Sequence, residues 1–153
     1  MDNLPLYILF SAILHVTEEY VYPGGFLVWA RENVPQIASR ITVRMAVIVN
    51  GLFIILCAGG VVFGGRHPMF ALSIAGLILV NGIIHVLSSI VTKSYSPGLI
   101  TSLVLYIPFS IYLFTYFSIS FTGILTLIFY GVLYHLFVPI ILFSPFNKPE
   151  TIK

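Results

Sequence analysis

Apolar residues form five long runs along the chain, separated by charged residues, prolines and glycines. The runs cover residues 4–22, 41–63, 68–91, 97–117 and 121–143. A membrane-spanning helix needs about 20 consecutive apolar residues, and each run is long enough. A transmembrane barrel would instead require short segments of alternating polarity. The pattern predicts one all-α domain over residues 1–153, a bundle of five transmembrane helices.

The segment between the first two runs, about residues 23–40, has a different character. Pro23-Gly24-Gly25 breaks the first helix, and the nearby Trp29 is typical of a segment that lies at the membrane interface. With five spans, basic residues are divided unequally between the two sides. One side has only Arg66, and the other has Arg31, Arg40, Arg44, Lys93, Lys148 and Lys153. Because cytoplasmic loops are rich in Lys and Arg, we expect the N-terminus outside and the C-terminus in the cytoplasm.

The composition agrees with an integral membrane protein, for which we expect the plasma membrane. The chain is 59% hydrophobic and only 8% charged, with a mean hydropathy of +1.06. The net charge of +2 follows from the excess of basic residues on one side. The sequence contains no long basic run, so we expect no nucleic-acid partner. Cys57 is the single cysteine, which excludes an intramolecular disulfide and zinc sites of the Cys-x-x-Cys type.

Ionisable residues interrupt the first apolar run at His15, Glu18 and Glu19. On a helix, His15 shares a face with the residues three and four positions later, so the imidazole and both carboxylates lie together. A charged residue in the middle of a membrane costs roughly 2.5 to 3.5 kcal/mol even on the most permissive scale. Such residues therefore mark a functional site by default, where a cation, a proton or a water-filled cavity compensates them.

Other apolar runs carry polar residues at the same depth. Counting helical rise from the outer end of each run places them in one layer, roughly 16 to 26 Å below the outer surface. The layer contains the cluster in the first run together with Asn50, Asn81, His85 and His135. We expect these side chains from four helices to lie close together.

The spacing His15-x-x-Glu18-Glu19 resembles the motif of the HXXEE family of small membrane proteins, whose function is uncharacterised. The five-run hydropathy is compatible with membership of that family. The resemblance implies that these three residues define the site. It implies no reaction, substrate or cofactor.

The residues themselves predict a mononuclear site for a divalent metal, zinc or iron. Three histidines and one carboxylate form a ligand set that suits either ion, and the bound ion would neutralise the charge of the buried glutamates. The predicted ligands are His15, Glu19, His85 and His135. Glu18 and Glu19 are the candidate catalytic groups, of which one binds the metal and the other acts as general base towards an activated water. Asn50 and Asn81 are expected to support the ligands or bind substrate.

Two other functions remain open from the sequence. The same residues suit a metal-free pair of glutamate and histidine for acid–base chemistry on a lipid. They also suit a carrier of protons or metal ions, for which Gly76 and Gly82 offer contacts that would support a homo-oligomer. A site in this layer is reached laterally from the lipid or through a cavity, so a membrane lipid or another apolar molecule is the expected partner.

Overall fold

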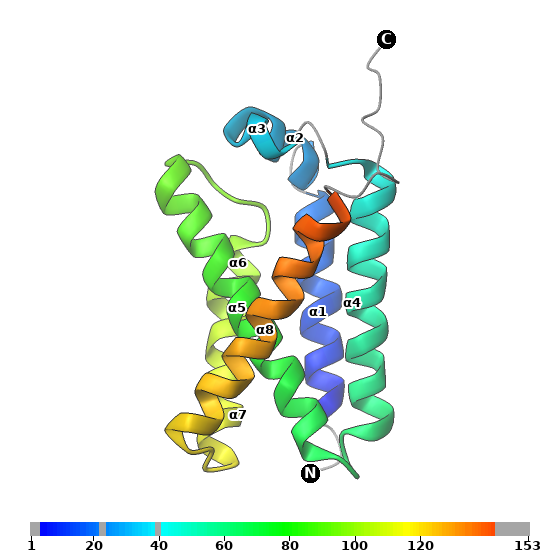
Figure 1. The fold of residues 1–153 in the computed structure, drawn as a ribbon, viewed down its shortest axis with the longest axis vertical. Coiled ribbons are helices and arrows are strands. Elements are labelled where there is room, and N and C mark those ends of the chain that lie inside the picture. The colour runs from blue at the N-terminus through cyan, green and yellow to red at the C-terminus, as the bar shows by residue number, and fades with distance from the viewer. Residues whose placement is uncertain (1–3, 22–23, 39–40, 143–153) are drawn as a thin grey trace.

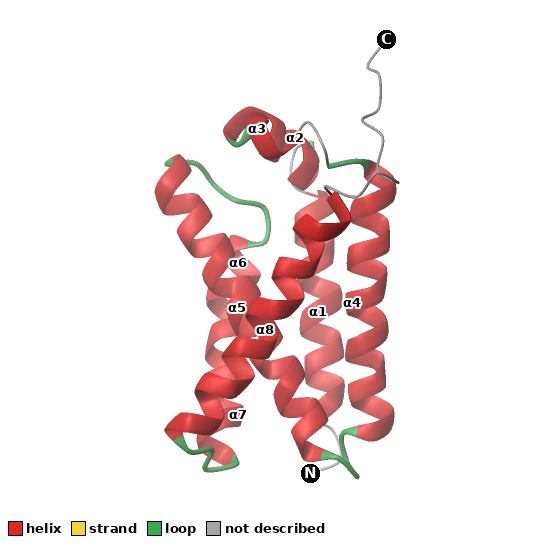
Figure 2. Ribbon diagram, viewed as in Figure 1, coloured by secondary structure: helices red, strands yellow, loops and turns green. Residues whose placement is uncertain are grey.

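The computed structural model describes residues 4–21, 24–38 and 41–142, and every regular element in these ranges is a helix (Figure 2). The long helices are α1 (Leu4–Val21), α4 (Val43–Phe63), α5 (Pro68–Thr92) and α8 (Phe121–Leu142). Two short helices, α2 (Gly25–Asn33) and α3 (Pro35–Ala38), occupy the segment between α1 and α4. The remaining helix has three parts, namely α6 (Leu99–Thr101), the π-helical turn η1 (Ser102–Tyr106) and α7 (Ile107–Tyr116). The predicted all-α fold is confirmed, and each of the five apolar runs forms a helix.

Local chemistry explains where several helices begin and end. The hydroxyl of Thr42 accepts a hydrogen bond from the backbone N–H of Met45 at 3.2 Å and caps the start of α4. Helix α5 begins with Pro68, at a position where no intrahelical N–H is needed. It ends where Lys93 takes a left-handed conformation with φ 53°, which turns the chain out of the helix.

The distribution of polarity is that of a membrane protein. Large apolar side chains are exposed along the outside of the bundle, for example Ile55, Ile90 and Val104. Polar side chains are buried inside it, including Ser11, His15, Glu19, His85, Ser102 and Ser110. Among the described residues, three helices are long and apolar enough to cross a membrane: Val43–Phe63, Pro68–Thr92 and the continuous Leu99–Tyr116. That α1 and α8 also cross it, and in which direction, stays a prediction.

Helix α5 lies at the centre, where glycines allow close contacts with its neighbours. A Cβ atom at Gly76 would lie 2.4 Å from the carbonyl oxygen of Leu127 in α8. One at Gly131 of α8 would lie 2.7 Å from the carbonyl oxygen of Gly76. Gly82 makes room in the same way for η1 and the start of α7, with Cβ of Tyr106 3.4 Å and the Ile107 side chain 3.1 Å from its virtual Cβ. The glycines expected to support an oligomer are therefore used within one chain, and an oligomer stays a prediction.

The loop of residues 93–98 folds back into the bundle. Figure 1 shows it descending from the end of α5, so that α6 begins beside the middle of that helix. The backbone N–H of Ser96 donates to the hydroxyl of Ser89, in the last turn of α5, at 2.9 Å. Since backbone groups inside a membrane need partners from the protein, this hydrogen bond compensates part of the cost of the buried loop. The run of residues 97–117 is helical as predicted, but its helix starts inside the bundle.

Candidate metal centre

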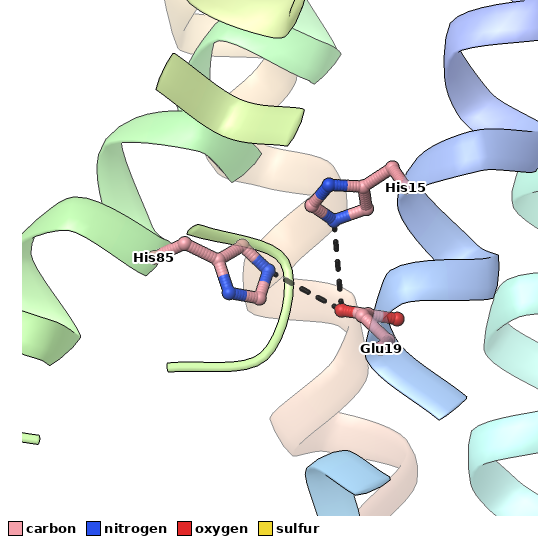
Figure 3. A group of neighbouring side chains, drawn as sticks. All are labelled: His15, Glu19 and His85. Atoms are coloured by element: carbon pink, nitrogen blue, oxygen red, sulfur yellow. Dashed lines mark ion pairs between the residues drawn. The ribbon is translucent and has the colours of Figure 1, made fainter. Parts of the chain in front are cut away.

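Two histidines from different helices point at one carboxylate oxygen (Figure 3). Glu19 follows His15 by one helical turn on α1, and His85 projects from α5. The Oε1 atom of Glu19 lies 3.6 Å from Nε2 of His15 and 3.2 Å from Nε2 of His85. One ligand atom from each residue lies within 4.8 Å of the other two, and all three residues are buried. The predicted proximity of these three residues is confirmed.

His15 is held by the hydroxyl of Thr101, whose oxygen lies 2.8 Å from Nδ1 of the imidazole. If Nδ1 donates to Thr101, the Thr101 proton goes to the carbonyl oxygen of Gly98 at 3.2 Å, and Nε2 presents a lone pair to the carboxylate of Glu19. If Thr101 donates to Nδ1, Nε2–H points at the same carboxylate at 3.6 Å. This buried Nε2 has no hydrogen-bond partner among the described residues.

His85 is held in the same manner by the folded-back loop. Its Nδ1 lies 3.1 Å from the hydroxyl oxygen of Ser96. If Nδ1 donates to Ser96, Nε2 of His85 presents a lone pair to Glu19. If Ser96 donates, Nε2–H donates to Glu19 at 3.2 Å. The first tautomer suits a cation between the three residues, and the second suits a direct hydrogen bond. Both keep the imidazole aimed at the same oxygen.

The second oxygen of Glu19 is bound by Asn50 of α4. The Nδ2 atom of Asn50 donates to Oε2 at 3.2 Å. This leaves Oε1 facing the histidines and fixes the plane of the carboxylate. Asn50 thus stands where the sequence predicted a supporting group, and groups of this kind orient metal-binding carboxylates in known sites.

Gly98 brings the loop against both imidazoles. Its φ of +100° lies in the left-handed region that favours glycine. A Cβ atom there would lie 2.8 Å from Cε1 of His15 and 2.9 Å from Cε1 of His85. Only a residue without a side chain fits between the two histidines at this point.

Glu18 turns away from the histidines and binds the start of the next helix. Its carboxylate accepts hydrogen bonds from the backbone N–H groups of Gly98, Ile100 and Thr101, at 3.1, 3.0 and 2.8 Å. The Tyr95 hydroxyl donates to it as well. The first N–H groups of a helix have no partner within the helix and attract negative charge. Glu18 therefore anchors the beginning of α6 beside the centre.

A family comparison gives the chain its place among known proteins. Residues 6–113 match the family model described as a protein of unknown function with HXXEE motif. The chain belongs to the HXXEE family. No curated protein and no solved structure matches it.

The structure explains the spacing of the HXXEE motif in this chain. His15 and Glu19 lie one helical turn apart and meet at the centre, whereas Glu18 faces α6. The motif therefore serves two sites from one helix. His15 and Glu19 belong to the His/Glu cluster, and Glu18 anchors the loop that lies against that cluster.

The other two predicted site residues form a separate pair. Nδ1–H of His135 donates to the carbonyl oxygen of Gly131 at 2.8 Å, and Nε2 of His135 lies 3.3 Å from Nδ2 of Asn81. His135 is not part of the group formed by His15, Glu19 and His85. Asn81 precedes His85 by one turn of α5, so the pair lies next to the centre. A ligand role for His135 stays a prediction.

The sequence did not identify the residues that α6, η1 and the preceding loop contribute. These are Ser96, Gly98, Thr101 and Tyr106. Ser96-Pro97-Gly98 is a turn signal in the sequence, but a turn of this composition is equally typical of a surface connection. Tyr95 of the same loop contacts Glu18 and was likewise not identified as part of the site.

Proposed function

We propose that the protein is a membrane-embedded metalloenzyme with one divalent ion bound by His15, Glu19 and His85. The observation that carries this proposal is the buried Nε2 of His15, which faces the carboxylate of Glu19 but has no hydrogen-bond partner among the described residues. A cation bound between the imidazole and the carboxylate would satisfy both buried groups. Atoms bound to one zinc ion at 2.0 to 2.2 Å lie at most about 4.4 Å apart, so the three residues need only small movements.

The ligand set supports catalysis better than a purely structural role. Three protein ligands leave an open position, and two histidines with one carboxylate occur in hydrolytic zinc sites and in non-haem iron oxygenases. A metal ion bound here would supply Lewis-acid activation of water for hydrolysis, or oxygen chemistry if the ion is iron. Thr101 and Ser96 orient the imidazoles, and Asn50 orients Glu19.

We assign Glu18 a positioning role in place of the general base predicted from the sequence. Both of its oxygens already accept hydrogen bonds from the start of α6. A general base needs a free lone pair directed at the proton that it removes. The substrate we propose is a membrane lipid or another apolar molecule, since the outer surface of the bundle is apolar.

A metal-free acid–base function is the second candidate. The 3.2 Å distance between Nε2 of His85 and Oε1 of Glu19 suits a direct hydrogen bond without an ion. In that arrangement the pair would hold one proton, as a catalytic pair or a proton carrier does. It leaves Nε2 of His15 without a partner, and for this reason we prefer the metal.

Elemental analysis of the full chain, purified in detergent without a histidine tag, tests the proposal. We expect about one zinc or iron per chain, lost in His15→Ala and in His85→Ala. His67→Ala is the matched control, because His67 is exposed and lies outside the centre. His135→Ala tests the fourth predicted ligand, and we expect it to retain the metal. A folded wild-type protein without metal, also after incubation with zinc or ferrous iron, would favour the acid–base function.

A further inference from the structure

The hydroxyl of Tyr106 is a second buried polar group near this centre that lacks a partner. Tyr106 is 0% exposed, and its Oη atom makes no hydrogen bond within the described residues. Buried tyrosine hydroxyls normally find a partner. Leaving one without a hydrogen bond costs roughly 1 to 3 kcal/mol. A ligand that binds this hydroxyl would recover that cost.

The ring of Tyr106 is held against a predicted metal ligand. It stacks on the imidazole of His15 with ring centroids 4.3 Å apart and planes at 25°. Phe53 of α4 contacts it edge-on at a centroid distance of 6.4 Å. On the α5 side, Gly82 lets the backbone approach, with 3.4 Å between its virtual Cβ and Cβ of Tyr106. Three helices thus fix the phenol beside His15.

The backbone at Tyr106 departs from a regular α-helix. Pro108 has no N–H, so the carbonyl group of Val104 cannot receive the usual hydrogen bond from the residue four positions later. The chain forms the π-helical turn η1 just before it, in which the N–H of Ile107 bonds the carbonyl oxygen of Ser102, five residues back. Such turns occur frequently at functional sites. Here the turn ends at Tyr106, the residue whose hydroxyl has no partner.

We propose that the Tyr106 hydroxyl donates a hydrogen bond to an oxygen atom of the ligand that takes the open position of the metal centre. This inference rests on the metal centre proposed above. The ligand class is a molecule with a carbonyl or phosphoryl oxygen, because the phenol offers a proton and a metal ion binds such an oxygen as a Lewis acid. Tyr106 would then determine how that oxygen is oriented.

Tyr106→Phe tests the role of the hydroxyl while keeping the ring stacked on His15. If the hydroxyl awaits a ligand, its removal leaves the thermal unfolding midpoint of the ligand-free protein unchanged or raises it. Tyr134→Phe is the comparison variant, because the hydroxyl of Tyr134 donates to the carbonyl oxygen of Val49 at 3.4 Å. A clear drop in the midpoint of Tyr106→Phe, larger than that of Tyr134→Phe, would identify a structural hydrogen bond and overturn the proposal.

The binding test uses protein loaded with Co²⁺ and titrated with acetohydroxamate, a small oxygen ligand, while the visible spectrum of cobalt is recorded. We expect Tyr106→Phe to bind the same amount of cobalt and to raise the Kd of acetohydroxamate about tenfold, the loss of one buried hydrogen bond. Tyr134→Phe should leave that Kd unchanged. Equal Kd values in wild type and Tyr106→Phe would overturn the role of Tyr106 alone. A wild-type protein that binds no cobalt would overturn the metal centre and this role together.

Discussion

Glu18 and Glu19 are adjacent in the sequence, yet their carboxylates have opposite surroundings. Glu18 faces backbone N–H groups at the start of α6, all of them proton donors. Glu19 faces two imidazole nitrogens, at 3.6 and 3.2 Å, and has Asn50 on its other oxygen. The first carboxylate is bound by backbone groups at the start of a helix, whereas the second faces two side chains that can bind a metal or a proton. A pair of identical residues can therefore divide anchoring and ligand binding between them.

The largest difference should appear when each carboxylate is replaced by its amide. Glu19→Gln removes the anionic ligand, so we expect metal affinity to fall more than about 100-fold. This loss exceeds the one typical of residues that only orient a metal ligand. Glu18→Gln keeps an oxygen acceptor for α6, and we expect its metal affinity to stay within about threefold of wild type. Competition with a chromogenic chelator measures both values. Equal losses in the two variants would contradict the division of roles.

Gly98→Ala should disturb both sites together, because Gly98 donates to Glu18 and lies against both imidazoles. The added methyl group would overlap the rings of His15 and His85, and the left-handed backbone adds strain. We expect loss of bound metal, measured by elemental analysis, together with a lower unfolding midpoint. Gly51→Ala is the matched control, since a Cβ there meets nothing within 4 Å. Full metal occupancy in Gly98→Ala would show that the loop does not hold the histidines.

Glu18→Ala should act mainly on stability. It removes the acceptor of three backbone N–H groups, and we expect a loss of about 3 kcal/mol in the free energy of unfolding. Glu18→Gln should recover more than half of it. Reversible unfolding in mixed micelles gives the comparison. A Glu18→Ala protein as stable as wild type would mean that other groups satisfy the start of α6.

Asn50→Ala should weaken metal binding less than the ligand substitution Glu19→Gln does. The side chain of Asn50 orients Glu19 without joining the three candidate ligands, so we expect metal affinity to fall about tenfold. Asn81→Ala is the counterpart on the other side of the centre, where the amide contacts His135. There we expect less than a twofold change in metal affinity. The reverse order of the two variants would place the metal nearer to His135.

Much of the cluster could be predicted from the depth of polar residues along apolar helices. His15, Glu19 and His85 lie together because helices of similar length, placed side by side in a membrane, bring residues at one depth to one layer. The same count could not separate Asn81 and His135 from this group, since depth gives no rotation about the helix axis. Nor could it assign different directions to Glu18 and Glu19, which differ by one helical step.

The contribution of the folded-back loop could not be predicted for a different reason. Hydropathy shows where an apolar run begins, and 97–117 was correctly expected to be helical. It does not show that the helix begins inside the bundle. That position depends on hydrogen bonds from the loop to Glu18 of α1, which is distant in the sequence, and to Ser89 and His85 of the preceding helix.

The partners of Glu18 also bear on how the chain enters the membrane during synthesis. The backbone N–H groups that bind Glu18 follow it by 80 to 83 residues. Proteins are made from the N-terminus onward, so these groups are made later. Until α6 is made, α1 carries two carboxylates without the donors that later surround one of them. If α1 crosses the membrane as predicted, a shortened chain that stops before Tyr95 should therefore hold this helix poorly in the lipid. The first helix has its complete set of hydrogen-bond partners only when the fold-back loop has been made.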